Sequence, residues 1–230
     1  GDDKMRRLLL FILMTLVLSF SVSAACIPRS SLGDIGNMIT NDTSLCAGSY
    51  IFNNTAEGNV FDLIGGNYTF NCNYSTIEAE AGTTQAIFHI TGDNITLVNC
   101  TIKNFDTGIN VESNNITTIL NIDMIVNGVN GINLNGVSNV FIKNVTIRLA
   151  NNGIYLSQSY NLTITESNIS DCNTGIMMNS GGEVNQTVIY NNIFSNTNNI
   201  DANGHTNNYL NTTKTLGTNI IGGAYMGGNF

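Results

Sequence analysis

The side chains of this sequence that could do acid–base chemistry are a small set of acids, chiefly Asp106, Glu112, Asp123 and Glu166. Hydrolysis of a glycosidic bond needs two carboxyl groups roughly 5 to 10 Å apart, one as proton donor and one as base or nucleophile. Whether any two of these acids meet that condition depends on the elements that carry them, so those elements have to be placed first.

The other reactive side chains are cations and imidazoles. Lys103 and Arg148 could pair with an acidic ligand or take up a proton, and His89 and His205 are the two histidines of the chain. Transition-metal sites combine several imidazole, thiolate or thioether ligands. No Met-rich stretch or Cys-His spacing of that kind is present, so we predict neither a metal site nor a cofactor.

A repeated dipeptide determines the architecture. Gly-Ile, or a close relative of it, recurs in steps of 22, 23, 22, 22 and 24 residues. A repeat of this length indicates a solenoid. The six occurrences are Ala86-Ile87, Gly108-Ile109, Gly131-Ile132, Gly153-Ile154, Gly175-Ile176 and Asn199-Ile200.

Apolar residues recur at fixed distances from each of these dipeptides, with polar residues between them. This alternation is typical of short strands with one buried face, and asparagines at the bends suit left-handed backbone. We therefore predict an all-β fold, a right-handed single-stranded parallel β-helix of about 22 residues per coil with an N-terminal cap. The positions predicted to face inward include Leu97, Leu120, Ile125, Val188 and, in the same set, His89.

On these coils the acids fall in different outward positions, so we predict no catalytic residue and no glycosidase or lyase activity. Glu166 is expected at the bend of Asn99 and Asn144, Glu112 beside Asn135, Ser157 and Asn179, and Asp123 in line with Cys100 and Val145.

Lys103 and Arg148 are expected to share an outward column, with Val126 between them and no acid. Ile119 and Phe141 are expected in a second outward column, Met124 beside Val126 on a neighbouring strand, and Tyr155 above Met177 in a third. An aromatic ring such as that of Tyr155 can stack on a sugar ring. The candidate binding residues are therefore Lys103, Arg148, Phe141 and Tyr155.

Four segments are expected along the chain. Residues 1–25 have the charged start, apolar run and small residues of a secretory signal peptide behind a short N-terminal extension. Residues 26–66 would form the N-terminal cap and first strands, with a capping helix within 31–40, and residues 67–206 the regular coils. Residues 207–230 are Gly-rich and end without a polar cap, so we expect the chain to be truncated there and to self-associate through an uncapped C-terminal coil.

Five cysteines in an exported chain favour disulfides. We predict the pairs Cys26–Cys46, which closes the N-terminal cap, and Cys72–Cys100, at equivalent bends of neighbouring coils, with Cys172 left as a thiol. In the alternative, Cys26 is the lipidated first residue of a lipoprotein and Cys46 loses its partner. Asn-x-Ser/Thr sequons offer glycosylation sites, among them Asn41, Asn53, Asn67, Asn94, Asn115, Asn161 and Asn211.

The charge balance argues against one class of partner. The whole chain has 8 basic and 16 acidic residues, and signal-peptide cleavage would leave 5 and 14. Nucleic acid needs clustered Lys or Arg, so we exclude it as a partner. Low charge density with many Asn, Thr and Ser residues suits a hydrated, uncharged polysaccharide and equally suits a structural wall protein.

Three stretches resemble a known family: "NYTFNCNYSTI", "NITLVNCTIKNFDTGI" and "TKTLGTNIIGGAYMGGNF". They are similar to NosD-type, pectate-lyase-like right-handed β-helix proteins of the kind found on archaeal cell surfaces, and the resemblance covers most of residues 45–230. It implies a surface protein, and we predict an exported, cell-surface protein with a structural or adhesive role that contacts glycans. Two alternatives stay open: a polysaccharide lyase or glycoside hydrolase, and a NosD-like factor for copper-site maturation.

Overall fold

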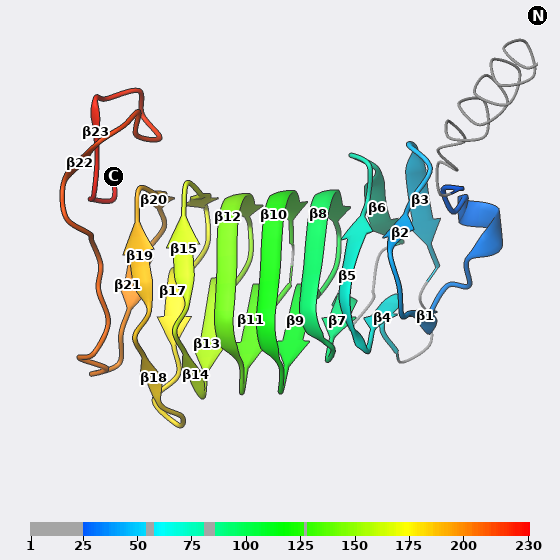
Figure 1. Ribbon diagram of the computed structural model, residues 1–230, viewed down its shortest axis with the longest axis horizontal. Coiled ribbons are helices and arrows are strands. Elements are labelled where there is room, and N and C mark those ends of the chain that lie inside the picture. The colour runs from blue at the N-terminus through cyan, green and yellow to red at the C-terminus, as the bar shows by residue number, and fades with distance from the viewer. Residues whose placement is uncertain (1–24, 54–57, 81–85, 127) are drawn as a thin grey trace, which may run out of the picture.

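The computed structural model describes residues 25–53, 58–80, 86–126 and 128–230. The chain forms a parallel β-helix in which strands of successive coils lie side by side from the N-terminal cap to the C-terminal segment (Figure 1). This is the fold class that the repeat predicts. The predicted signal peptide lies, apart from Ala25, outside the described residues, and within the described residues no helix is long and apolar enough to cross a membrane.

One face of the β-helix is an eight-stranded sheet, in which each strand pairs in parallel with the strand one coil away. Its strands begin near the repeated dipeptide. In spatial order they are β1 (Asn37–Ile39), β4 (Phe61–Leu63), β7 (Ala86–Ile90), β9 (Thr107–Glu112), β11 (Asn130–Asn135), β13 (Asn152–Ser157), β17 (Thr174–Met178) and β21 (Asn198–Asp201).

The rest of each coil belongs to a thirteen-stranded sheet that bends around the core. Its central strands are the long β8 (Asp93–Lys103), β10 (Asn115–Ile125) and β12 (Ser138–Arg148). On the N-terminal side lie β2 (Thr43–Ser44), β3 (Ser49–Phe52), β5 (Gly66–Asn71) and β6 (Thr76–Ala79). On the C-terminal side lie β14 (Ser159–Tyr160), β15 (Thr163–Thr165), β16 (Asn168–Ser170), β18 (Val184–Asn185), β19 (Val188–Tyr190) and β20 (Ile193–Ser195).

The long strands turn a corner at one asparagine each. Asn99, Asn121 and Asn144 have φ values of 59°, 54° and 53°, a left-handed conformation that asparagine tolerates better than most residues. Their side-chain amides form a ladder across the coils, with Asn121 donating to Asn99 at 3.0 Å and Asn144 to Asn121 at 2.9 Å. The predicted bend position of Glu166 is confirmed, since its φ is 52°.

The glycine of the repeated dipeptide is required by close packing of the coils. A Cβ atom added at Gly131 would lie 2.5 Å from the carbonyl oxygen of Gly153, and one at Gly153 would lie 2.6 Å from that of Gly175. A side chain at these positions would therefore collide with the backbone of the next coil. The dipeptide pairs this close approach with an isoleucine that is fully buried, as at Ile154.

The core changes character along the axis. The N-terminal coils pack four phenylalanine rings, Phe52, Phe61, Phe70 and Phe88, with centroids 5.2 to 5.8 Å apart between contacting rings. Tilted and edge-on ring pairs of this kind add to the stabilisation from burial alone. Further coils are filled by isoleucine ladders such as Ile132, Ile154 and Ile176, which pair in register.

Several positions predicted to face inward are shifted by one residue. Ile119 and Met124 are fully buried, and their neighbours Leu120 and Ile125 are the partly exposed residues. Ile189 is likewise buried where Val188 was expected. The prediction that Ile119, Met124 and Val126 point outward is wrong, since all three are buried. The steps of 22 to 24 residues place their extra residues in turns, and a slip of one residue reverses the side of the strand.

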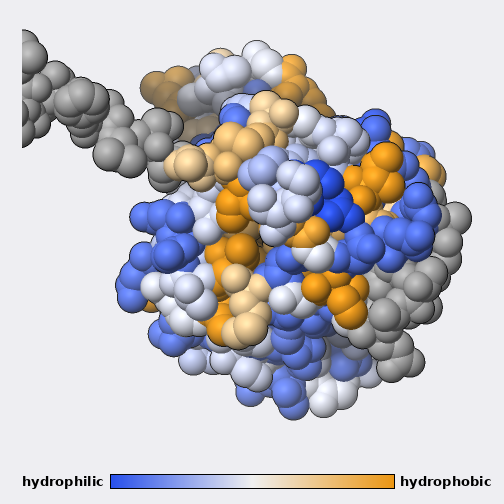
Figure 2. Space-filling model, turned by 90° about the vertical axis from the view of Figure 1, so that its right-hand side faces the viewer, coloured by the Kyte–Doolittle hydropathy of each residue, from blue (hydrophilic) through white to orange (hydrophobic). Residues whose placement is uncertain are grey.

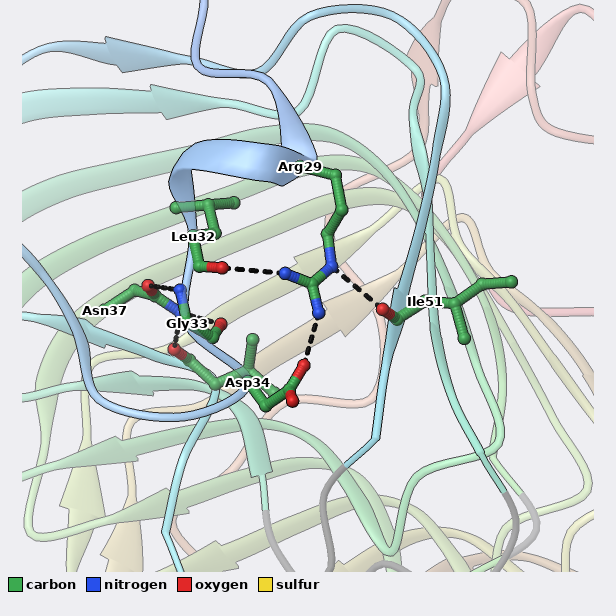
Figure 3. A network of polar contacts seen from close by, with 7 residues as sticks. Arg29, Leu32, Gly33, Asp34, Asn37 and Ile51 are labelled. Atoms are coloured by element: carbon green, nitrogen blue, oxygen red, sulfur yellow. Dashed lines mark hydrogen bonds and ion pairs between the residues drawn. The ribbon is translucent and has the colours of Figure 1, made fainter.

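The N-terminal cap is held by an arginine instead of the predicted helix. Residues 31–40 contain the strand β1, and the helical element is the 3-10 turn Arg29–Ser31. Arg29 donates from Nε to the Ile51 carbonyl at 2.8 Å and from Nη1 to the Leu32 carbonyl at 2.7 Å, and it pairs with Asp34 (Figure 3). Its guanidinium also lies 4.2 Å from the centroid of the Phe52 ring, a cation–π contact.

The N-terminal end shows apolar residues in separate groups divided by hydrophilic ones (Figure 2). The edge strands β1 and β3 contribute exposed apolar side chains to the surface, Met38 at 67% and Ile51 at 51%. The strands within the predicted cap already pair with later coils, β1 with β4 and β3 with β6. Parallel stacking therefore already begins within the predicted cap, where Ile27 pairs with Leu45.

The C-terminal segment returns to the β-helix at both of its ends. Tyr209 pairs in parallel with Val188, and Phe230 exchanges backbone hydrogen bonds with Asn192 and Phe194 at 2.8 Å. Between these contacts the chain forms a separate antiparallel hairpin of β22 (Thr215–Leu216) and β23 (Tyr225–Met226) (Figure 1).

Candidate functional site

The four predicted binding residues do not share one face. Lys103 and Arg148 lie in one outward column of the thirteen-stranded sheet, and Phe141 lies in another column of that sheet, between Thr118 and Thr163. Tyr155 lies on the eight-stranded sheet, stacked above Met177 as predicted. The two cations and Phe141 therefore cannot act on the same ligand segment as Tyr155 from one flat surface.

Two details of the predicted cation column are wrong. The residue between Lys103 and Arg148 is Ile125, because Val126 lies beyond the end of β10 and is buried. An acid does share this column, since Glu78 is the partner of Lys103 on the neighbouring strand. Arg148 also pairs with Asp123 at 3.1 Å, so both cations have acidic neighbours.

One of the acids is also placed differently from the prediction. Asp123 pairs with Thr101 and Thr146, one residue away from the predicted line through Cys100 and Val145. Glu166 contacts Lys143 at 3.1 Å. Glu112 is confirmed beside Asn135 and Ser157.

The structure brings together a set of polar side chains that the sequence analysis missed. His89 faces outward and is partly exposed, so its predicted inward position is wrong. Its Nδ1 lies 3.1 Å from Asp62 Oδ1 and its Nε2 lies 3.4 Å from Glu112 Oε2. Three coils thus contribute one residue each to a contact between an imidazole and two carboxylates.

Asparagines extend this contact along the sheet. Asn110 donates to Glu112 Oε1 at 3.0 Å, Asn133 donates to Asn110 Oδ1 at 2.7 Å, and Asn59 donates to Asp62 Oδ1 at 3.0 Å. We call Asn59, Asp62, His89, Asn110, Glu112 and Asn133 the polar strip. It runs across β4, β7, β9 and β11, perpendicular to the strands and therefore along the axis of the β-helix.

The column of the polar strip continues beyond it. On the outward face the residues in register are Met38, Asp62, His89, Asn110, Asn133, Tyr155, Met177 and Asp201. Strands in a sheet are about 4.8 Å apart, so this column presents one side chain at each such step. A parallel column two residues further along each strand contains Glu112, Asn135 and Ser157.

The sequence contains a signal for this column that the Gly-Ile alignment does not use. Several of its strands have a polar residue between two buried apolar ones, as in Phe61-Asp62-Leu63, Phe88-His89-Ile90 and Ile109-Asn110-Val111. Alignment of these triplets would have placed Asp62, His89 and Asn110 in one column. The repeated dipeptide instead aligned Ile87 with Ile109, whereas the strand register pairs Phe88 with Ile109.

The chemistry of the polar strip follows from its donors and acceptors. A carboxylate only accepts, so both contacts of His89 are hydrogen bonds when the ring carries a proton on each nitrogen. The two carboxylate oxygens lie on opposite sides of one imidazole ring, and inverting glycosidases likewise use two carboxyl groups, which are roughly 6.5–9.5 Å apart. In those enzymes, however, a water molecule occupies the space that His89 fills here.

The cysteines pair as the sequence predicts. Cys26 is joined to Cys46 and Cys72 to Cys100, while Cys172 is a buried thiol. Burial is the main cause that raises the pKa of the Cys172 thiol. A disulfide at Cys26 leaves no thiol for a lipid, so the lipidated alternative does not hold.

All seven predicted glycosylation candidates have exposed side chains: Asn41, Asn53, Asn67, Asn94, Asn115, Asn161 and Asn211. Some of these amides are engaged by neighbouring coils. Asn94 donates to Asn67 at 2.9 Å, and Asn161 donates to Asn139. Glycosylation at these residues stays a prediction.

The other histidine, His205, and the free cysteine, Cys172, lie far apart in the chain and have other partners. His205 is in the C-terminal half, where its Nε2 lies 3.1 Å from the Asn179 carbonyl oxygen. The Cys172 thiol donates to the Ser170 carbonyl at 3.3 Å. In the described part of the chain, no three His, Cys, Asp or Glu side chains are grouped so that they could hold a metal ion.

Among solved structures, the chain is similar to the crystal structure of the Dettilon tailspike protein. The TM-score is 0.33 at 11% sequence identity, and the match covers 66% of this chain and 44% of the tailspike. The chain thus spans less than half the length of that protein. No curated protein matches the sequence.

A family model described as periplasmic copper-binding protein (NosD) matches residues 35–230. The donor set of the described residues does not fit the copper of that description. The two ring nitrogens of His89 face different carboxylates on opposite sides, so Asp62 and Glu112 do not converge on one metal position. The match nevertheless covers most of the chain, including every coil described above, and the chain therefore belongs to the NosD family.

Proposed function

We propose that this chain is an exported, cell-surface β-helix protein that binds an extended glycan along the outer face of its eight-stranded sheet, without catalysis. The observation that carries the proposal is the column of outward side chains from Asp62 to Tyr155, one on each successive strand. A polymer with a repeated set of hydroxyl groups suits such a series of hydrogen-bonding groups. Export agrees with the periplasmic description of the family and with two disulfides, which persist outside the cytoplasm.

Tyr155 supplies the aromatic contact. It follows Asn133 in the same column, and Met177 follows Tyr155. A half-buried tyrosine offers a flat apolar ring and a polar tip, a combination suited to the faces and hydroxyl groups of sugars. The polar strip and Tyr155 together give hydrogen bonds at one end of the column and stacking at the other.

Lack of catalysis is supported by the position of His89. Hydrolysis with inversion requires a water molecule between the acid and the base, and the imidazole occupies that place with contacts of 3.1 and 3.4 Å. The other acid–cation pairs of the β-helix, Arg148–Asp123 and Lys143–Glu166, hold one carboxylate each.

The test is affinity electrophoresis of the mature chain in gels that contain single polysaccharides, both neutral and charged. At least one polysaccharide should slow the protein, and Tyr155→Ala should abolish most of that retardation. Phe141→Ala is the matched control, because it removes a half-exposed aromatic ring from the other sheet. Normal mobility in every gel, or equal loss with Phe141→Ala, would contradict the proposal.

A screen for released reducing ends or unsaturated products tests the non-catalytic part. We expect none from any polysaccharide that binds. Product formation that disappears in Asp62→Asn or Glu112→Gln would show that the polar strip is catalytic.

A further inference from the structure

We infer that the polar strip selects glycans that carry protonated amino groups and rejects acidic glycans. This inference rests on the proposed function and names the ligand class of the same face. It is carried by two features of the strip: which of its hydrogen-bonding groups remain for a ligand, and which charges surround it.

Each asparagine amide of the polar strip uses one of its two N–H donors within the strip. The amide groups of Asn59, Asn110 and Asn133 each donate to a side-chain oxygen of the strip, and both ring nitrogens of His89 face carboxylates. Four of these five contacts end on the two carboxylates, and the fifth ends on the Asn110 side-chain oxygen. The groups that remain for a ligand are therefore chiefly acceptors, since a carboxylate has several lone pairs and no proton to give.

The carboxylates are accessible. The Asp62 side chain is 27% exposed and that of Glu112 is 40% exposed. Asp62 Oδ1 contacts both the His89 ring and the Asn59 amide group. Among the described residues, Asp62 Oδ2 has no hydrogen-bond partner. A ligand at this position has to donate, which an ammonium group does with three protons and which a uronate carboxylate cannot do.

The charges around the strip act in the same direction. All five Lys and Arg residues of the described chain lie elsewhere: Arg29 in the cap, Lys103, Lys143 and Arg148 on the thirteen-stranded sheet, and Lys214 in the C-terminal segment. The column of the strip adds a further acid at Asp201. Recognition of a carboxylate or sulfate group uses Arg or Lys, so an acidic chain would meet like charges here.

The experiment measures binding of three oligosaccharides of equal length to the mature chain by isothermal titration calorimetry. They are a glucosamine oligomer with free amino groups, its fully N-acetylated counterpart and a galacturonate oligomer, compared under mildly acidic conditions that keep the amine protonated. We expect the amine-bearing oligomer to bind at least about tenfold more tightly than the other two, the scale of one charge-assisted hydrogen bond. Its affinity should fall as salt is added, because salt screens exposed charges.

Isosteric variants assign the preference to the strip. Asp62→Asn and Glu112→Gln keep the shape and the acceptor oxygen but remove the charge, and each should reduce the preference for the amine-bearing oligomer about tenfold. Glu78→Gln on the other sheet is the matched control and should leave the preference unchanged. Thermal unfolding of each variant verifies that the fold is intact.

The outcomes separate this inference from the proposal beneath it. Equal or tighter binding of the galacturonate or N-acetylated oligomer, or an equal effect of Glu78→Gln, overturns the amine preference and leaves glycan binding in place. If none of the three oligomers and no polysaccharide in the gels binds, the proposed function itself fails.

Discussion

The two sheets of this β-helix share one core but present opposite kinds of polar surface. On the thirteen-stranded sheet acids and cations occur together, with Lys143 beside Glu166 and Arg148 beside Asp123, each at 3.1 Å. On the eight-stranded sheet the polar strip places two carboxylates around one histidine, without Lys or Arg among the described residues of that face. The first surface balances its charges internally, whereas the second leaves negative charge for a partner.

The difference also has an energetic side. Exposed ion pairs contribute about 0–1 kcal/mol each, so the charges of the thirteen-stranded sheet add little to stability. The hydrogen bonds of the polar strip join residues of four coils, and their loss would affect the stacking of those coils together. The comparison thus predicts that mutations on the two faces differ in both size and salt dependence.

The largest change in stability is expected where a charge is placed in the core, and it tests which residues of β10 face outward. Met124→Asp would place a charge in the core without a partner and should destabilise the protein by about 3–5 kcal/mol or more. Its neighbour Ile125 lies between Lys103 and Arg148 on the surface, so Ile125→Asp should change stability by less than about 0.5 kcal/mol. Urea unfolding of both variants measures this, and the reverse order would show that the register of β10 is wrong.

An intermediate effect is expected at the corners, which the two sheets form differently. Gly153→Ala should cost roughly 1–3 kcal/mol, because the added methyl group collides with the next coil. Asn144→Ala should cost about 1–2 kcal/mol through its left-handed backbone and lost amide contact.

Gly48→Ala is the control for these corner variants, since an added Cβ there meets nothing within 4 Å. Its melting temperature should match that of the parent. Equal loss in all three variants would mean that the corners have no special role.

The smallest changes in stability are expected from the polar contacts on the two sheets, and they compare the two surfaces directly. A double-mutant cycle of Arg148→Ala and Asp123→Ala should give a coupling below about 1 kcal/mol that disappears in high salt. His89→Ala should cost about 1–2 kcal/mol, because it removes two charge-assisted contacts and leaves Asp62 and Glu112 without their common partner. Denaturant unfolding at low and high salt gives both values, and a coupling between Arg148 and Asp123 larger than the loss of stability in His89→Ala would invert the comparison.

The sequence by itself determined the β-helix, because each coil repeats the same physical requirements. A glycine is needed where the next coil's backbone comes within 2.5–2.7 Å of a side-chain position, as at Gly108, Gly131 and Gly153, and a buried isoleucine follows it. Asparagine is needed where a long strand turns with positive φ. The two disulfides were also predictable, since their cysteines flank the cap and lie at equivalent bends of neighbouring coils.

The tertiary structure alone decided the register within the coils and the composition of the polar strip. Asp62 and His89 are 27 residues apart, while His89 and Glu112 are 23 apart, so a fixed period places the first pair in different columns. Counting residues also does not say which turn takes up an extra one. Because side chains alternate between the faces of a strand, that choice determines whether a residue such as His89 is buried in the core or faces a ligand.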